Sequence, residues 1–508
     1  MIPGDIIRRT AVSYPHKVGV IFGDQKYTWQ GVNTRVNRLA NGLLKLGLQK
    51  QDKVAILCPN CNQYLEFYLA ISKAGLVGVP LNYRFIGKEL ALLINHSEAK
   101  VLITSQDYID TLEGMSSALK GVENYIGLGE KHPYSLDYEK LLNESSPDEP
   151  QADVSEDDLF VLSYTSGTTG RPKAATITGT NSISGILSMA IYMRLVPNDV
   201  YLLHAPMFFG AAGGARLHCV LRGCTSIITT FRPREFLEII EKEQITAFSL
   251  GPTGLRMLAN EPEIGKYDLS SVRKIVVSGG RLSVPIWQKL QQFFGQIFYP
   301  GYGMTESSIS GTMVEPEEIA AEGPLAKRIA SVGKPCFSAD VRVVNEAGGD
   351  VTHDGHEVGE IIMHGDPITK GYWKEPETTA ETIRSGWLYT GDMATVDEDG
   401  FLYIVDRKKD MIKSGGINIF PKEIEDIIYT HHAVLHAAVI GVPDEKWGET
   451  VKAMITLKEG TTASEEEIIE LCKKNLASYK KPTSVEFIDH MPLTADGKPL
   501  KRELKEKH

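Results

Sequence analysis

Short apolar runs alternate with amphipathic stretches between residues 54 and 299, and this alternation is the strongest constraint on the fold. Runs such as 54–57 (VAIL), 101–104 (VLIT) and 274–278 (KIVVS) have the length and composition of buried strands. Residues 234–243 (REFLEIIEKE) place apolar side chains at helical spacing. Strands that alternate with helices predict an α/β fold, in which parallel sheets are flanked by helices.

The pattern of the chain changes near residue 330, and again after residues 406–410 (DRKKD). Between these points, strand-like runs such as 358–363 (VGEIIM) are separated by glycine-rich turns, which indicates a β-rich subdomain at about 330–405. Residues 421–428 (PKEIEDII) then begin with proline and early acidic residues, as helices do. The 508 residues are thus expected to form a large domain at 1–405, a hinge at 406–410 and a small α+β domain at 411–508.

Residues 163–173 (SYTSGTTGRPK) combine very small side chains with cations. Glycine lets another group approach the main chain closely, and serine and threonine add hydroxyl donors. Together with the cations, they suit an oxyanion and above all a polyphosphate. A flexible linker has a similar composition, but residues 158–164 (DLFVLSY) read as a buried strand, and phosphate loops follow strands. The predicted phosphate-binding residues are Thr165, Ser166, Gly167, Thr168, Thr169, Gly170 and Lys173.

A P-loop nucleotide-binding site is the nearest rival for this stretch, and its pattern fails. That pattern needs glycine and lysine side by side, followed by serine or threonine. Here Gly170 is followed by Arg171 and Pro172, and Lys173 is followed by Ala174. The sequence therefore predicts a phosphate loop of another kind.

Charge and cysteine content exclude several other classes of protein. The net charge of −11 argues against general binding to nucleic acids or anionic membranes. Six cysteines are sparse for this length and indicate a reducing compartment. Residues 1–15 lack an apolar signal core, and no apolar run approaches the roughly 20 residues that span a bilayer. A cytoplasmic protein is therefore expected, with peripheral membrane contact left open.

Cys58 and Cys61 have CxxC spacing. Neither a second cysteine pair nor a nearby histidine pair completes a zinc site. We therefore expect buried thiols at a strand-to-helix turn rather than a redox or metal site.

Four further stretches follow the 163–173 loop: 301–306 (GYGMTE), 387–392 (WLYTGD), 406–418 (DRKKDMIKSGGIN) and 492–498 (PLTADGK). In this combination the chain resembles the adenylate-forming superfamily of acyl-CoA synthetases, luciferases and peptide-synthetase adenylation domains. The pattern is closest to the fatty-acyl and aryl acyl-CoA ligases, and the match covers essentially the whole chain. The resemblance implies an enzyme that uses ATP, Mg²⁺ and coenzyme A. A carboxylate attacks ATP, which releases pyrophosphate and leaves an acyl-adenylate, and a thiol then displaces AMP.

The resemblance also implies roles for named residues. The loop from Thr165 to Lys173 would hold the β- and γ-phosphates, and Glu306 would hold Mg²⁺, which favours carboxylate and phosphate oxygens. Without the resemblance, we would expect Glu306 to be a surface glutamate and Tyr302 to be a core residue. The remaining implied roles are α-phosphate contact by Thr305, adenine stacking by Tyr302, adenine approach to the backbone at Gly279 and Gly280, ribose binding by Asp392, and ribose or phosphate contact by Arg407.

Lys498 has the sharpest implied role. From composition alone, we would expect the charged C-terminal residues around Lys498 to lie on the solvated surface. The resemblance instead places its ammonium between the incoming carboxylate and the α-phosphate, where two anions meet. A mobile C-terminal domain would then turn about Lys409 and bring up the pantetheine-lining residues Lys413, Ser414, Gly415 and Gly416.

The acyl pocket is assigned to Phe208, Phe209, Gly303 and Met304. Residues 206–214 contain no acid that could hold a substrate ammonium, which favours an apolar fatty or aryl acid. Three positions depart from the family pattern. Phe209 and Gly179 stand where histidine is frequent, and Arg281 stands where a small residue is usual.

Three alternatives to an acyl-CoA ligase remain open. The acyl group could pass to the thiol of a separate carrier protein, or luciferase-like oxygenation could use the same residues. A non-catalytic nucleotide-binding scaffold is the third, and the joint presence of Lys498, Glu306 and Asp392 argues against it. The oligomeric state, with a homodimer as one option, is also left open.

Overall fold

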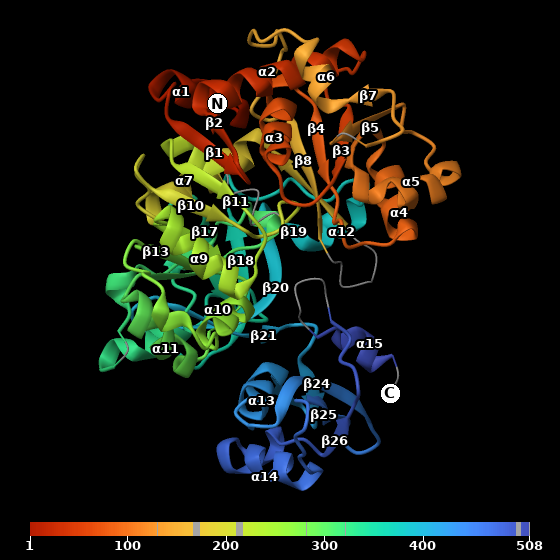
Figure 1. Cartoon of the computed structure of the whole chain (residues 1–508). Coiled ribbons are helices and arrows are strands. Elements are labelled where there is room, and N and C mark those ends of the chain that lie inside the picture. The colour runs from red at the N-terminus through yellow and green to blue at the C-terminus, as the bar shows by residue number, and fades with distance from the viewer. Residues whose placement is uncertain are drawn as a thin grey trace. The chain divides into compact units, whose positions relative to one another are not determined.

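The computed structural model describes residues 1–129, 131–165, 173–209, 217–280, 282–320, 322–493 and 499–506. The chain divides into two compact units (Figure 1). The first contains Met1–Val341 and Met363–Leu388, and the second contains Arg342–Ile362 and Tyr389–His508. Among the described residues, no helix combines the length and the apolar character that crossing a bilayer requires.

A nine-stranded sheet in the first unit has a parallel centre and antiparallel edges. Its order is β16 (Lys334–Pro335), β15 (Thr312–Met313), β14 (Phe298–Tyr302), β13 (Lys274–Val277), β12 (Ala247–Leu250), β10 (Val200–Leu203), β11 (Thr225–Ile228), β1 (Val18–Phe22) and β2 (Gln25–Thr28). The strands from β14 to β1 in this order are parallel neighbours. At the edges, β2, β15 and β16 pair in antiparallel fashion. The carboxyl ends of the central strands therefore lie along one edge of the sheet.

A seven-stranded sheet in the same unit holds both ends of the predicted phosphate loop. Its order is β7 (Leu136–Asp137), β6 (Asn124–Leu128), β5 (Ala99–Ser105), β3 (Lys53–Leu57), β4 (Val77–Pro80), β8 (Leu159–Thr165) and β9 (Lys173–Thr178). Its neighbours are parallel except β8 and β9, which are antiparallel with Thr165 opposite Lys173. Residues 166–172, between these strands, lie outside the described residues.

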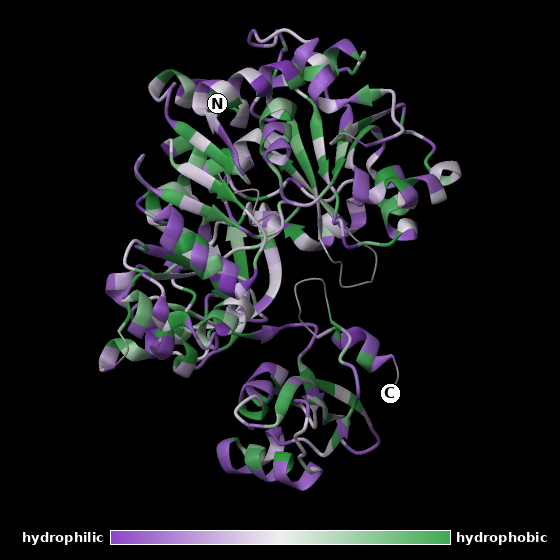
Figure 2. Ribbon diagram, viewed as in Figure 1, coloured by the Kyte–Doolittle hydropathy of each residue, from purple (hydrophilic) through white to green (hydrophobic). Residues whose placement is uncertain are grey.

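Helices cover the sheets of the first unit. They are α1 (Pro3–Ser13), α2 (Trp29–Lys45), α3 (Asn62–Ala74), α4 (Gly87–Ser97), α5 (Ile109–Gly114), α6 (Tyr138–Asn143), α7 (Gly179–Tyr192), α9 (Pro233–Glu243), α10 (Pro252–Ala259), α11 (Val284–Phe294) and α12 (Pro376–Thr382). Short 3-10 turns are η1 (Gln106–Tyr108), η2 (Ser116–Ala118), η3 (Ile264–Lys266), η4 (Thr305–Ser307), η5 (Pro316–Glu318) and η6 (Pro324–Ala330). Figure 2 shows the strands of both large sheets largely in green and the helices in mixed green and purple, as expected for helices with one buried face.

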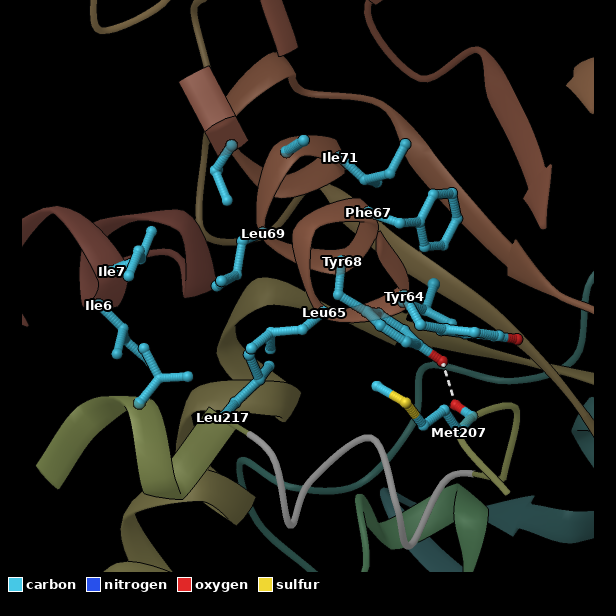
Figure 3. Packing of buried hydrophobic residues seen from close by; sticks show 14 of the residues in the cluster. Ile6, Ile7, Tyr64, Leu65, Phe67, Tyr68, Leu69, Ile71, Met207 and Leu217 are labelled. Carbon is cyan, nitrogen blue, oxygen red and sulfur yellow. Dashed lines mark hydrogen bonds between the residues drawn. The ribbon is translucent and has the colours of Figure 1, made fainter. Parts of the chain in front are cut away.

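Helix α3 is an exception because it is buried almost completely, including the charged residues Glu66 and Lys73, which form ion pairs with Arg35 and Glu149. It packs against α1 and α2. Figure 3 shows this core from close by, with Ile6 and Ile7 of α1 facing Leu65 and Leu69 of α3.

Two smaller sheets complete the fold. One has the order β17 (Asp340–Val344), β18 (Gly359–His364), β20 (Trp387–Val396) and β19 (Ile383–Arg384), with β21 (Leu402–Arg407) paired to β20. The other lies in the second unit and has the order β23 (Ile417–Ile419), β22 (Ile412–Ser414), β25 (Gly448–Leu457) and β24 (Val434–Asp444), with β26 (Ser484–Phe487) paired to β25. The second unit also contains α13 (Pro421–Ile428), α14 (Glu465–Asn475), η7 (Ser478–Lys480) and α15 (Lys501–Lys505).

The predicted α/β class, with parallel sheets flanked by helices, a β-rich part and an α+β C-terminal part, is confirmed. The 301–306 motif is predicted to follow a strand, but β14 extends to Tyr302 because Gly301 and Tyr302 pair with β15. Cys58 is buried and Cys61 partly buried, and both are free thiols between β3 and α3. The domain boundary at 406–410 stays a prediction.

Candidate active site

Three of the predicted segments follow parallel strands of the nine-stranded sheet. Residues 206–209 follow β10, Gly279 and Gly280 follow β13, and residues 302–306 leave the sheet at the end of β14. Ligands of open α/β sheets bind outside the carboxyl ends of the strands. Gly279 has a φ of +83°, which suits a tight turn directly after β13. The topology therefore gathers these segments at one edge of the sheet.

Lys173, Tyr372 and Glu306 converge beside the predicted phosphate loop. The hydroxyl of Tyr372 donates a 2.9 Å hydrogen bond to Glu306 Oε1. Lys173 Nζ lies 5.7 Å from the centre of the Tyr372 ring, within range of a cation–π contact. Glu306 is only 5% exposed, so reading it as a surface glutamate is wrong. The predicted phosphate cation and the predicted Mg²⁺ carboxylate thus share Tyr372 as a neighbour.

Backbone pairing places Tyr372 beside Glu306. Tyr372 forms an isolated antiparallel bridge with Ala175 of β9. Three residues earlier, the amide of Thr369 donates to the carbonyl of Glu306 at 2.7 Å. Segment 369–373 therefore connects β9, which follows the predicted phosphate loop, with the η4 turn that carries Thr305 and Glu306.

The donor set around Glu306 fits Mg²⁺ that arrives with a nucleotide. Burial and the adjoining Glu306 carboxylate raise the pKa of Tyr372, so its phenol stays protonated and continues to donate. Mg²⁺ commonly uses one or two protein carboxylates, and substrate phosphates complete its shell. Within the described part of the chain, no three His, Cys, Asp or Glu side chains form a metal-binding group. A buried carboxylate close to Lys173, at the end of the predicted phosphate loop, suits a nucleotide-borne ion better than a resident metal.

Aromatic side chains meet where the acyl pocket is predicted. The ring centres of Phe208 and Phe209 are 4.3 Å apart, and Tyr83 contacts Phe208 edge-on at 5.3 Å. Phe208 is buried and Phe209 is partly buried against the same core. Figure 3 shows Met207, just before them, accepting a 3.1 Å hydrogen bond from the hydroxyl of Tyr68. The segment thus presents an uncharged aromatic surface.

Asn60, inside the CxxC stretch, fixes the loop in front of this surface. Its side-chain nitrogen donates to the carbonyls of His204, Ala205 and Thr229 at 3.2, 3.0 and 3.0 Å. Its side-chain oxygen accepts from the amide of Met207 at 2.8 Å. Asn60 is buried, so these bonds join the ends of β10 and β11 to the residue before Phe208. The CxxC stretch therefore has a structural role through the side-chain amide of Asn60, which lies between the two cysteines in the sequence.

Gly303 and Met304 begin a tightly wound loop that contains Thr305 and Glu306. A Cβ on Gly303 would lie 2.5 Å from the carbonyl carbon and oxygen of Ile309, so only glycine fits there. The amide of Ile309 donates to the carbonyl of Met304 at 3.0 Å. Gly303 thus packs on backbone, and its assignment to the acyl pocket stays a prediction.

Packing also accounts for one of the three departures from the family pattern. A Cβ on Gly179 would lie 2.8 Å from the carbonyl oxygen of Glu156, which leaves no room for a side chain. The Phe209 ring contacts the Phe208 ring at a tilt of 50°. Arg281 lies outside the described residues.

In the second unit, strand register brings Asp392 and Arg407 together. The two residues are opposite each other on β20 and β21, and Arg407 Nε lies 3.1 Å from Asp392 Oδ1. Asp392 is buried, whereas the Arg407 side chain is 56% exposed. Asp392 and Arg407, which are both predicted to contact the nucleotide, therefore form an ion pair with each other.

Gly415 and Gly416 form the two-residue turn of the β22–β23 hairpin. Their φ values of +56° and +81° and the pairing of Ser414 with Ile417 indicate a type I′ turn, which strongly favours glycine at both positions. Lys413 lies on β22 and is exposed. The turn geometry explains the two glycines without a ligand, and a pantetheine-lining role stays a prediction.

Lys498 and residues 166–170 of the phosphate loop lie outside the described residues. Leu493 and Pro499 form an antiparallel bridge, and the amide of Leu500 donates to the carbonyl of Pro492 at 2.8 Å. The residues that enter and leave segment 494–498 are thus paired with each other.

Comparison with known proteins places this arrangement in context. The AMP-binding enzyme family matches residues 7–373, and the AMP-binding enzyme C-terminal domain matches residues 423–498. A feruloyl-CoA synthase of an Amycolatopsis species is 37% identical over 501 residues, covering 98% of this chain and 97% of the relative. A long-chain-fatty-acid–CoA ligase of Bacillus subtilis is 34% identical and covers 99% of this chain and 93% of the relative. The structure of an anthranilate CoA ligase in complex with anthranoyl-AMP is similar with a TM-score of 0.89 at 26% identity, covering 100% of this chain and 97% of that one.

Proposed function

This chain belongs to the AMP-binding enzyme family and is an ATP-dependent, AMP-forming acid–CoA ligase, and on that premise we propose which acid it activates and which residues serve each half-reaction. The predicted adenylate-forming activity is confirmed at this level. Transfer to a carrier protein and a non-catalytic scaffold are not favoured, since curated relatives that match nearly the whole chain are CoA ligases.

The proposed substrate is an apolar carboxylic acid with an aryl or fatty tail. The aromatic side chains of Tyr83, Phe208 and Phe209 support this choice, because their rings offer apolar contact to an aryl or fatty tail. Two relatives named for feruloyl and long-chain fatty acids support the same class.

In the proposed adenylation step, cations and oriented donors screen the carboxylate that approaches the α-phosphate of ATP. The observation that carries this proposal is the convergence of Lys173, Tyr372 and Glu306. Lys173 and the amides and hydroxyls of residues 165–170 bind the β- and γ-phosphates, and Thr305 and Lys498 contact the α-phosphate. Tyr372 holds the Glu306 carboxylate in place. Mg²⁺, when bound at Glu306, supplies charge neutralisation to the polyphosphate.

The same proposal assigns residues to nucleoside binding and to the CoA step. Tyr302, Gly279 and Gly280 hold adenine, and Asp392 and Arg407 hold the ribose. Lys409 changes its backbone conformation between the half-reactions, and residues 413–416 line the path of pantetheine. A cytoplasmic location and a homodimer are also proposed.

A panel of acids tests the substrate class. Benzoic, ferulic, octanoic, palmitic and glutamic acids are each assayed for pyrophosphate release, with and without CoA. Release with aryl or fatty acids but not with glutamic acid is expected, and thioester should form when CoA is added. Preference for glutamic acid would reject the apolar pocket, and pyrophosphate release without any thioester would reject CoA as the acceptor.

Lys498→Ala tests the catalytic assignment. The variant should lose adenylation and largely keep thioester formation from supplied acyl-AMP and CoA. Equal loss of both half-reactions would contradict the assigned role.

A further inference from the structure

Two buried carboxylates and a partly buried lysine in the second unit connect the C-terminal helix with the predicted hinge. Lys501 Nζ lies 2.8 Å from Glu425 Oε1, and the two side chains are 14% and 8% exposed. Asp406, which is also buried, accepts hydrogen bonds of 2.7 Å from the amides of Arg407 and Lys422. The charges therefore join the first residue of α15, the middle of α13 and the end of β21.

Lys501 pairs with Glu425 and also acts electrostatically on Asp406. Burial lowers the pKa of Lys501, but Glu425 and Asp406 outweigh this effect and the pKa lies above its ordinary value. Burial raises the pKa of the Asp406 carboxyl, and Lys501 is the foremost opposing influence. A buried carboxylate is costly without a partner, so removing the ammonium of Lys501 would leave a charge uncompensated.

The same residue lies close in sequence to Lys498. Lys501 follows it by three positions and directly follows Leu500, whose amide pairs with Pro492. One turn further, Leu504 packs with Ile440, Met454 and Met491 in a small apolar core. The chain that leaves residue 498 is thus anchored first by a backbone bond, then by a buried ion pair and then by an apolar side chain.

We propose that Lys501 is a positioning residue for adenylation, because its ion pair with Glu425 fixes the start of α15 and so the place from which Lys498 acts. This inference rests on the proposed role of Lys498. Catalytic groups must be held within a fraction of an ångström, since a displacement of about 1 Å can lower a rate by about 100-fold. An arginine at position 501 can keep the ion pair, whereas a methionine of similar length cannot.

The test compares Lys501→Met with Lys501→Arg and with the control Arg502→Met. Arg502 lies on the same helix and makes an exposed pair with Glu506 at 3.4 Å. Each variant is measured for single-turnover acyl-AMP formation, for thioester formation from supplied acyl-AMP and CoA, and for thermal unfolding. The acid is the one of the panel that wild type activates best.

We expect Lys501→Met to slow acyl-AMP formation by about 100-fold and to change the CoA step by less than about threefold. Lys501→Arg should recover most of the adenylation rate, and Arg502→Met should match wild type. Equal loss of both half-reactions, or no loss of either, would overturn the inference.

Two further variants keep the test decisive. Should Lys501→Met fail to fold, Glu425→Gln removes the charge but keeps an oxygen for the amide of Val439, which now lies 2.8 Å from Glu425 Oε1. The same split between half-reactions is expected, and its absence would count against Lys501. Lys498→Ala is measured in parallel. Adenylation that survives Lys498→Ala would reject the proposed function itself, whereas loss there with none in the Lys501 and Glu425 variants would reject only this inference.

Discussion

Tyr372→Phe removes a single oxygen atom from the candidate active site. That oxygen donates the 2.9 Å hydrogen bond to Glu306 Oε1, and Glu306 is only 5% exposed. A hydrogen bond to a charged group contributes about 1.5–3 kcal/mol, and little water can replace the lost donor at a buried carboxylate. Phenylalanine preserves the ring that Lys173 contacts, so the cation–π contact should survive. The substitution therefore isolates the orientation of Glu306.

The expected effect on adenylation follows from that energy. If the bond holds Glu306 for the transition state, its loss should lower kcat/KM for pyrophosphate release by about 10- to 150-fold, since each 1.36 kcal/mol is a factor of ten. The assay is pyrophosphate release with saturating ATP over a series of Mg²⁺ concentrations. Thioester formation from supplied acyl-AMP should change much less, because that step starts after pyrophosphate has left.

A matched control separates this effect from general loss of stability. Tyr27→Phe, in the same unit, removes an exposed hydroxyl that donates to Gln25 at 2.8 Å, and it should leave both half-reactions unchanged. Adenylation by Tyr372→Phe within about twofold of wild type would refute the reasoning, since it would leave less than about 0.5 kcal/mol for the bond.

Three further outcomes are expected. Asn60→Ala removes two amide protons shared among three carbonyls and one acceptor oxygen, which is about three full hydrogen bonds. At about 1 kcal/mol each, the free energy of unfolding in urea should fall by about 3 kcal/mol, and a loss below about 1 kcal/mol would show that Asn60 does not hold this loop in place. Burial lowers the pKa of His204 and His218 from 6.5 to about 4 and about 3, so below pH 6.5 the unfolded chain binds protons that the fold excludes. The free energy of unfolding should therefore fall as pH drops from 6.5 toward 4. If the His218→Leu variant shows the same dependence of stability on pH as wild type, His218 does not contribute to it. Lys409→Pro should keep pyrophosphate release and slow the CoA step, and unchanged CoA-step kinetics would remove the hinge role.

Much of the fold could be predicted because its local signals agree with its long-range structure. The helix predicted at 421–428 is α13, Pro421–Ile428, since proline at its start and apolar residues at helical spacing both favour that range. The apolar runs 54–57 and 101–104 lie in β3 and β5, which are buried on both faces as parallel strands require.

The neighbours of the site residues could not be predicted in the same way. Tyr372 reaches Glu306 only because segment 369–373 pairs with the edge of β9, and no periodicity in the sequence encodes that pairing. The role of Asn60 depends on the carbonyl groups of two strands that lie far away in sequence. The adjacent glycines of residues 415–416 did carry a local signal for a tight hairpin turn, because the strand-like residues on both sides lead directly into them.

The loop after Glu306 shows how main-chain packing holds this part of the chain in place. Ser308 and Ile309 have φ values of +48° and +60°, a left-handed conformation that is costly for a β-branched residue. Such strain persists only where the surroundings enforce it. Here a Cβ on Gly185 of α7 would clash with the carbonyl oxygen of Ser308, and one on Gly303 would clash with that of Ile309. Close backbone packing on both sides therefore fixes the turn. Main-chain geometry and the hydrogen bond from Tyr372 therefore both contribute to the position of Glu306.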